Sequence, residues 1–441
     1  TQKEFHRIVD LIVDRSFGQN RIDLEAIETC LRDGLHRAGF AALGRLFARL
    51  EESSSSHAPA CTDGHPHRKA GSRPKRLMTI LGPVDIRRPY YYDALCKQGW
   101  SPFDHVLDVE GVMFSPGVRN MMAYVGSKEP FREAHEDLLR LAGLGIPAKS
   151  IERLCSAIGE QVEAYQQRRA PNSDLRMLGK GLPHETLYIE YDGTGVPVLK
   201  RETVGRKGKG ADGVGKTREM KVGCVFTQTR VNDDGYAVRD EASTSYVGAC
   251  ETAEDFQWRI LHHARVRGLD LAHRLCVLGD GAPWIWNIAD EHFPTAYQIV
   301  DLYHARQHYS NVGKLFLPEN SKELKQWLQK RERELDKGDT DAVIRALARL
   351  QSRSKHAREV RDKGIMYFRN NACRMRYRYF RNLGLFVGSG VIEAGCKTVV
   401  GQRLKQSGMH WSIRSADNIV ALRCLFLGNQ WDDFWEDRAA A

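Results

Sequence analysis

The sequence predicts an α/β fold class, with a strand-rich middle region between α-rich regions on both sides. Short apolar segments alternate with turn-rich segments between residues 187 and 301. Apolar residues recur at helical spacing in residues 4–50, 115–167 and 303–383. The chain has 441 residues, which suits two to four domains of about 100–200 residues each.

The composition is that of a globular protein, with 42% hydrophobic and 28% charged residues. No apolar run approaches the roughly 20 residues of a membrane helix, and the first residues lack the layout of a signal peptide, so we expect a cytoplasmic protein. The ten cysteines include no C-x-x-C pair, which indicates reduced thiols. The net charge of +10 suits a polyanionic partner.

The first part of the chain predicts four regions. Residues 1–52 form an N-terminal helical region, and residues 53–76, rich in Ser, Pro, Gly and charge, form a flexible linker. Residues 77–110 contain a β-hairpin about a Gly82-Pro83 turn. Residues 111–180 contain a helix pair, with the second helix capped near Ser150. This pair is either a DNA-binding helix-turn-helix or a plain helical hairpin, and the hairpin is favoured because helix pairs are common in α-rich domains.

The second part of the chain contains the expected sheet. Residues 181–310 predict three consecutive strands, then a helix, a strand, a helix and a strand, which make an α/β layer. Residues 311–385 predict a helical insertion rich in basic side chains, and residues 386–441 predict C-terminal helices.

One motif suggests a nucleotide site. Residues 210–217 read GADGVGKT, which satisfies the phosphate-loop pattern. Such a loop needs a buried strand before it and a helix after it, and the flanking segments predict neither. We therefore reject a nucleotide hydrolase and interpret the segment as a basic loop that contacts a phosphate backbone through Lys207, Lys209, Lys216 and Arg218.

Three acidic residues are candidates for metal binding. Asp192 and Asp280 each end an apolar strand and precede a glycine, and α/β folds place their sites at strand ends. Glu393 lies just inside a predicted helix. If folding brings the three carboxylates together, they would hold two Mg²⁺ (or Mn²⁺) ions. The alternative is that the aspartates only form turns and that Glu393 only stabilises a helix start.

The order of these acids and the segments around them resemble the RNase H-like DDE transposases of bacterial insertion sequences, most closely the ISKra-type group and its ISLre-type relatives. The resemblance extends from LGPVDIRRPYYY to WDDFW and includes YDGTGVP, LGDGAPWIWN, VDLYHA and GSGVIEAGCK. It implies an RNase H-like catalytic core, a mixed sheet with flanking helices. It also implies that Asp192, Asp280 and Glu393 are the catalytic acids of a metal-dependent nuclease and strand transferase.

The resemblance implies partners as well. The substrate would be double-stranded DNA, namely the terminal inverted repeats of the element and the target DNA. The active form would be a homo-oligomer, a dimer or larger, associated with the bacterial nucleoid. The alternative function is a catalytically inactive, domesticated DNA-binding protein derived from a transposase.

The Asp-x-x-His segment of the family corresponds to Asp301 and His304. His304 has two open interpretations: it orients the scissile phosphate or donates a proton, or it caps a helix and pairs with Asp301. Asp301 is a candidate fourth metal ligand, although a buried Asp–His pair at the strand end is the simpler account.

Many relatives have a zinc ribbon around the tyrosine-rich hairpin, with a C-x-x-C pair on each side. This sequence keeps only Cys61 and Cys96 of those positions. His65, His67 or Asp93 could substitute for the missing ligands. A structural zinc ion needs four ligands, so the incomplete set argues against bound zinc.

Further basic residues are candidates for DNA contact. In NACRMRYRYFRNLG, one helical face holds Cys373, Tyr377 and Phe380, and the next holds Arg374, Arg378 and Arg381. The alternative is an ordinary solvated face. Near Glu393, the candidates are Lys397, Arg403 and Lys405.

Overall fold

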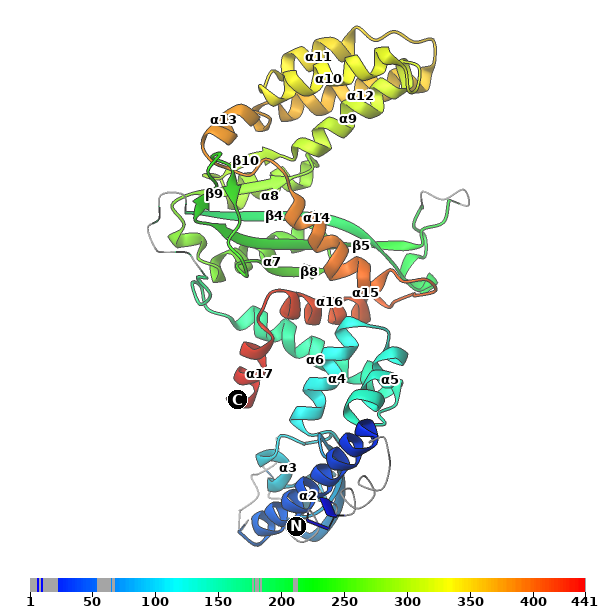
Figure 1. Ribbon diagram of the computed structural model, residues 1–441, viewed down its shortest axis with the longest axis vertical. Coiled ribbons are helices and arrows are strands. Elements are labelled where there is room, and N and C mark those ends of the chain that lie inside the picture. The colour runs from blue at the N-terminus through cyan, green and yellow to red at the C-terminus, as the bar shows by residue number, and fades with distance from the viewer. Residues whose placement is uncertain are drawn as a thin grey trace. The chain divides into compact units, whose positions relative to one another are not determined.

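The computed structural model describes residues 6–7, 9–10, 23–53, 65, 68–176, 178, 182, 185–208 and 213–440. The chain divides into two compact units, Thr1–Leu154 and Cys155–Ala441. The described residues form a three-stranded, a five-stranded and a two-stranded sheet together with many helices (Figure 1). The fold is therefore mixed α/β, as the sequence predicts.

The first unit contains a three-stranded antiparallel sheet and a long helix. Its small core consists of apolar side chains from the helix, the middle strand and a short following helix, namely Phe47, Val84, Ile86 and Phe103. This packing explains why the alternating apolar residues of the hairpin form a strand with one buried face. The elements are α2 (Leu24–Ser53), β1 (Arg68–Thr79), β2 (Gly82–Asp93), β3 (Gln98–Trp100) and α3 (Pro102–Val106).

The predicted hairpin is confirmed, with two differences. The turn consists of Ile80 and Leu81, because Thr79 pairs directly with Gly82. β1 also begins at Arg68, so residues 68–76 are strand and not linker. Their side chains are mostly exposed and polar, and pairing with β2 satisfies the backbone groups without burying a core. Composition alone therefore gave no sign of this strand.

Three helices follow the hairpin. α5 ends at Gly143, which adopts a left-handed conformation with φ of 70°. α6 begins at Ala148, two residues before the predicted cap, because Ser150 already donates its backbone N–H to the carbonyl of Pro147. The bounds are α4 (Pro116–Lys128), α5 (Phe131–Ala142) and α6 (Ala148–Arg168).

The second unit contains a mixed five-stranded sheet with the order β10-β9-β4-β5-β8. β4 lies in the middle, antiparallel to β5 and parallel to β9. The side chains from Thr186 to Tyr191 are buried, which explains the nearly continuous apolar run of this strand. The strands are β4 (Thr186–Pro197), β5 (Thr217–Gln228), β8 (Ser245–Ala249), β9 (Leu275–Gly279) and β10 (Tyr297–Val300).

Helices cover both faces of this sheet (Figure 1). On one face, the hydroxyl of Tyr191 donates to the carbonyl of Ile285 in α8. On the opposite face, a carboxylate oxygen of Glu190 accepts from the backbone N–H of Ile392 in α14. The predicted order of strands and helices is confirmed. The covering helices are α7 (Ala253–Val266) and α8 (Pro283–His292) on the first face, and α14 (Gly390–Gly395) and α16 (Ile413–Leu427) on the second.

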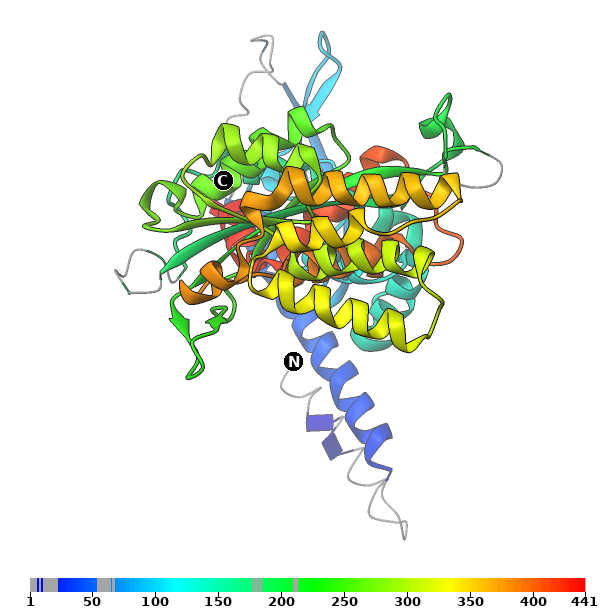
Figure 2. The same cartoon turned by 90° about the horizontal axis from the view of Figure 1, so that it is seen from above.

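The helical insertion between β10 and α14 is also confirmed. Its main helices pack side by side as a bundle (Figure 2). The two ends of the insertion meet, because the backbone N–H of Leu302 donates to the carbonyl of Val387 over 2.9 Å. The helices are α9 (Leu302–Phe316), α10 (Lys322–Asp336), α11 (Thr340–Ala348), α12 (Lys355–Asn371) and α13 (Tyr377–Asn382).

Shorter elements complete the second unit. After α14 the chain forms a π-helix, then α15 and α16, and ends in α17. A two-stranded hairpin follows β5. The bounds are β6 (Arg230–Val231), β7 (Ala237–Val238), η1 (Lys200–Thr203), η2 (Leu269–Leu271), η3 (Ala372–Arg374), the π-helix η4 (Cys396–Gly401), α15 (Gln402–Leu404) and α17 (Trp431–Ala440).

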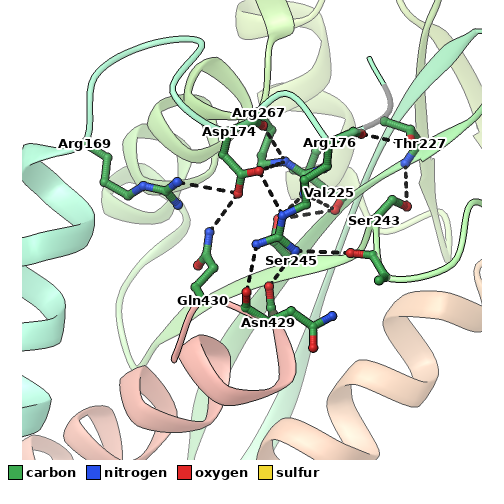
Figure 3. Close-up of polar contacts among 12 residues, drawn as sticks. Arg169, Asp174, Arg176, Val225, Thr227, Ser243, Ser245, Arg267, Asn429 and Gln430 are labelled. Carbon is green, nitrogen blue, oxygen red and sulfur yellow. Dashed lines mark hydrogen bonds and ion pairs between the residues drawn. The ribbon is translucent and has the colours of Figure 1, made fainter. Parts of the chain in front are cut away.

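A polar cluster around Asp174 joins distant segments of the second unit (Figure 3). The carboxylate pairs with Arg176 at 2.9 Å and Arg169 at 3.5 Å, and accepts a hydrogen bond from Gln430 at 3.0 Å. The fully buried Arg267 donates to the backbone carbonyl of the same aspartate. Burial opposes ionisation, but the positive charges of these arginines outweigh it and lower the pKa of Asp174.

Among the helices within the described ranges, none is both long and apolar enough to cross a membrane.

Candidate metal-binding site

Asp192 in β4 and Asp280 just after β9 lie next to each other beyond the paired part of these two parallel strands. The last paired residues of β4 and β9 are Glu190 and Leu278, and each aspartate lies two residues further along its chain. Asp280 directly follows β9, as predicted. Asp192 lies inside β4, not at its end, because pairing with β5 continues to Pro197.

Gly281 determines how the chain leaves Asp280. Its backbone φ of +100° is one that residues other than glycine rarely adopt. A Cβ atom at this position would also lie 2.5 Å from Cε2 of Tyr367. The hydroxyl of Tyr367 donates to the backbone carbonyl of Asp280 over 2.8 Å. The glycine after the acid is therefore needed both for the turn and for the close approach of α12.

Glu393 reaches the same region from the C-terminal part of the chain. It lies in the first turn of α14, which packs on the sheet face that bears Glu190 and Asp192. Its side chain is 40% exposed, and Oε1 lies 3.7 Å from Nδ1 of His304. The carboxylate is therefore accessible to a ligand.

Electrostatic interactions connect these side chains. Burial raises the pKa of Asp192, the backbone N–H of Gly193 lowers it, the negative charge of Asp280 raises it again, and His304 lowers it. The pKa of His304 is raised, mainly by its hydrogen bond to Asp301 and further by the charges of Asp280 and Glu393. The structure thus gathers the five predicted side chains in one neighbourhood, while their catalytic roles stay predictions.

Asp301 is a structural residue at the start of α9. Its Oδ1 accepts from the backbone N–H of His304, and its Oδ2 accepts from the backbone N–H and the hydroxyl of Ser389. Burial opposes ionisation, but the interaction with the His304 side chain and these hydrogen bonds outweigh it and lower the pKa of Asp301. His304 Nδ1 lies 3.4 Å from Oδ1, so both open interpretations of the histidine keep support: it pairs with Asp301 and it also faces Glu393.

The donor atoms suit a hard divalent cation. One ligand atom from each of Asp301, His304 and Glu393 lies within 4.8 Å of the others. Asp192 and Asp280 add carboxylate oxygens on the adjoining strands. Carboxylate oxygens are the ligands that Mg²⁺ prefers, so these residues fit the cation that the sequence predicts.

Two residues of this region were not predicted. Glu190, two positions before Asp192, is completely buried, and burial raises its pKa to about 8. Cys396 Sγ lies 3.9 Å from Oδ2 of Asp192, and burial raises the thiol pKa to about 12. The acidic residue within the apolar run LYIEYD was the available signal for Glu190. The spacing of three residues between Glu393 and Cys396, which follows α14 directly, was the signal for the cysteine.

A second group of metal-ligating side chains lies in the first unit. His65 Nδ1 is 3.1 Å from Sγ of Cys96 and 3.6 Å from Oδ2 of Asp93. The three ligand atoms lie within 4.8 Å of one another. Cys61 and His67, the other predicted positions, lie outside the described residues. Three of the four ligands of a tetrahedral site are thus adjacent, and the expectation of no zinc stays a prediction.

The basic loop before β5 is described in part. Lys207 and Lys216 are exposed, Arg218 is half-buried and donates to the carbonyl of Glu202, and Lys209 lies outside the described residues. The segment GADGVGKT leads into β5 and not into a helix, so the context of a phosphate loop is missing, as predicted.

The predicted arginine face of residues 373–381 is only partly present. Cys373 is exposed and not packed, because η3 interrupts the helix between α12 and α13. Arg374 contacts Gln298 and the ring of Trp286 within the protein. Arg378 is exposed, and Arg381 forms a 3.7 Å ion pair with Asp336.

The basic residues near Glu393 differ in exposure. Lys397 is exposed, and Lys405 donates to the hydroxyl of Thr194 on β4, near the carboxylates. Arg403 is completely buried, and its guanidinium lies 5.1 Å from the ring centre of Trp411. The prediction that Arg403 contacts DNA is therefore wrong in this fold, because the side chain has no exposed surface.

The fold and this site define a mixed α/β protein with a cluster of carboxylates of the metal-ligand type. The chain belongs to the uncharacterised protein family UPF0236, whose pattern matches residues 67–431. This family is associated with transposase-like proteins. No curated protein matches the chain.

Proposed function

We propose that the protein is a DDE-type DNA transposase with an RNase H-like core, which cleaves and joins the ends of its own insertion sequence. One observation supports this most strongly. Asp192, Asp280 and Glu393 are far apart in the sequence, yet β4, β9 and α14 bring them to one neighbourhood around His304. The mixed sheet with helices on both faces is the arrangement that the resemblance implies.

Each residue then has a role. Asp192, Asp280 and Glu393 would hold the divalent cations, and Asp301 positions His304 by its hydrogen bonds. Two Mg²⁺ or Mn²⁺ ions bound there would stabilise the attacking and leaving oxygens of a phosphodiester. The side chain of His304, which Asp301 positions, would donate a hydrogen bond from its ring to a non-bridging oxygen of the scissile phosphate.

The proposed partner is double-stranded DNA. The net charge of +10 favours a polyanion. The exposed Lys397 and Lys405 lie near the carboxylates, and the exposed Lys207 and Lys216 lie in the loop before β5. The proposed active form is a homo-oligomer, because two element ends must be joined in one reaction. The proposed location is the bacterial nucleoid in the cytoplasm.

The test is cleavage of duplex oligonucleotides that carry the ends of the element encoding this chain, with Mg²⁺ or Mn²⁺. We expect the full chain to cut them, and Asp280→Asn to cut at least about 100-fold more slowly, since one metal ligand loses its charge. Asp341→Asn, an exposed aspartate of α11, is the matched control and should keep full activity. Full activity of Asp280→Asn would refute the assignment. Tight, sequence-specific binding without any cleavage by the unmodified chain would instead identify the inactive DNA-binding alternative.

A further inference from the structure

A cavity of about 470 Å³ lies directly beside the candidate metal site. Asp301 and Glu393 are part of its wall. The rest of the wall comes from the β6–β7 hairpin, the first turn of α9, α13 and the segment just before α14. Its volume lies within the range of about 300–1,000 Å³ that is typical of ligand sites.

Two tyrosines of this wall are largely exposed. Tyr236 on the hairpin is 58% exposed, and Tyr303 in α9 is 65% exposed. Gly388 borders Tyr303 closely, since a Cβ atom there would lie 3.4 Å from Cε2 of the tyrosine ring. Single exposed aromatic residues are common. Two of them in one cavity, next to a cluster of carboxylates, provide flat apolar surfaces for a planar ligand.

The cavity also contains a cation and an apolar floor. Arg381 lines it, and a 3.7 Å ion pair joins one terminal nitrogen of its guanidinium to Asp336. A guanidinium has five N–H donors and binds phosphate with two of them at once. The apolar floor includes Phe386, whose ring packs edge-on against Tyr188 of β4. Aromatic rings, an apolar floor and one cation together suit a nucleotide: a base between the tyrosines and its phosphate on the arginine.

We propose that this cavity, the base pocket, receives one unpaired nucleobase of the DNA end, from the nucleotide next to the phosphate at the carboxylates. Tyr236 and Tyr303 stack on the base, and Arg381 binds the adjoining phosphate. The proposal rests on the proposed function, because the carboxylates fix which phosphate is meant. A base stacked on these tyrosines cannot keep its stacking neighbours and its partner in the duplex, so the base must leave the helix.

The first test is photochemical and needs no cleavage. The full-length Asp280→Asn protein is bound to the end duplex, with 5-iodouracil placed in turn at each position within a few nucleotides of the cleavage point. A halogenated base stacked on an aromatic ring crosslinks to it on irradiation. We expect one position to crosslink, with the adduct on Tyr303 or Tyr236. Crosslinks only elsewhere, or none, would overturn the base pocket and leave the proposed function intact.

The second test is kinetic. Base stacking on an aromatic ring contributes about 1–3 kcal/mol, so we expect Tyr303→Ala to cleave the paired end at least about fivefold more slowly, and Tyr303→Phe to cleave normally. An end that lacks this base should be cut equally by both proteins. Tyr379→Ala, an exposed tyrosine outside the pocket, is the matched control. A slower Tyr303→Ala reaction that persists on the end lacking the base would contradict the proposal.

Discussion

The carboxylate of Asp301 holds Ser389, because Oδ2 accepts hydrogen bonds from both the backbone N–H and the hydroxyl of that serine. Asp301 begins the helical insertion, and Ser389 precedes the helix that bears Glu393. Two segments almost ninety residues apart in the chain are thus fixed to one side chain. This contact and the hydrogen bond from Ile392 to Glu190 both hold the start of α14, the helix that bears Glu393.

We therefore expect Asp301→Ala to destabilise the protein. The change removes the cap of α9, which costs about 1–2 kcal/mol, and leaves the buried N–H of Ser389 unsatisfied, which costs about 1–3 kcal/mol more. The measurement is the free energy of unfolding in urea. Asp339→Ala removes the cap of α11 at a more exposed position and should cost only about 1 kcal/mol. Equal losses for the two variants would show that the contact with Ser389 contributes nothing.

Glu190 gives a prediction about activity. Its Oε2 accepts from the backbone N–H of Ile392 over 2.9 Å, next to Glu393. Glu190→Gln keeps an acceptor oxygen and should cleave DNA within about threefold of the original rate. Glu190→Leu removes the acceptor, and we expect at least a tenfold loss in kcat with little change in KM, because α14 shifts. Circular dichroism verifies that both variants are folded. A leucine variant with unchanged kcat would contradict this role.

His263 predicts a specific pH dependence of stability. Its ring is buried and lies 2.9 Å from the hydroxyl of Ser245. Burial is the main cause that lowers its pKa from 6.5 to about 3; the charges of Arg267, Arg169 and His262 contribute to this shift, whereas Asp174 opposes it. Below pH 6.5 the unfolded chain therefore binds a proton that the folded chain does not. The free energy of unfolding consequently decreases as the pH is lowered.

The loss should amount to about 1.6 kcal/mol between pH 6.5 and pH 5, because the slope is half of about 1.4 kcal/mol per pH unit at pH 6.5 and approaches the full value at pH 5. The measurement is the free energy of unfolding across this range, compared between the unmodified chain and His263→Gln. The glutamine has no proton to bind, so this part of the slope should be missing from the variant. Parallel curves for the two proteins would exclude the histidine as the cause.

Arg378 and Arg403 should respond differently to substitution. Arg378 is exposed, so Arg378→Gln should leave stability unchanged and weaken DNA binding, with the slope of log affinity against log salt smaller by about one. Arg403 is buried against Trp411, so Arg403→Gln should lower the free energy of unfolding instead. Binding titrations at several salt concentrations and urea unfolding measure both effects. A salt slope that changes only for Arg403→Gln would reverse our assignment.

Much of the sheet could be predicted because its strands have simple environments. Both faces are buried along Thr186–Tyr191 of β4 and Met220–Gln228 of β5, and these segments contain the apolar runs LYI and VGCVF. Asp192 and Asp280 stood out because a charged residue directly follows such a run. Their proximity could not be predicted from the sequence, because it depends on the parallel pairing of β4 with β9, which only the fold shows.

The sequence predictions differ from the structure where burial or secondary structure depends on contacts between segments that are far apart in the chain. Arg403 has the pattern of a surface residue, and only its contact with Trp411 shows that it is buried. β1 has the composition of a linker, and its pairing with β2 makes it a strand. Glu190 was overlooked because strand periodicity does not indicate that α14 supplies a hydrogen-bond donor to it.

The hydrogen bond between Leu302 and Val387 joins the two ends of the helical insertion and so affects how the length of this insertion can vary. The chain leaves the sheet and returns to it at the same place, so the length of the helical insertion does not affect the distances between the carboxylates. Whole helices such as α10 and α11 can then be gained, lost or exchanged between homologous chains without altering the acid geometry, and a foreign domain spliced into their loops would leave that geometry in place.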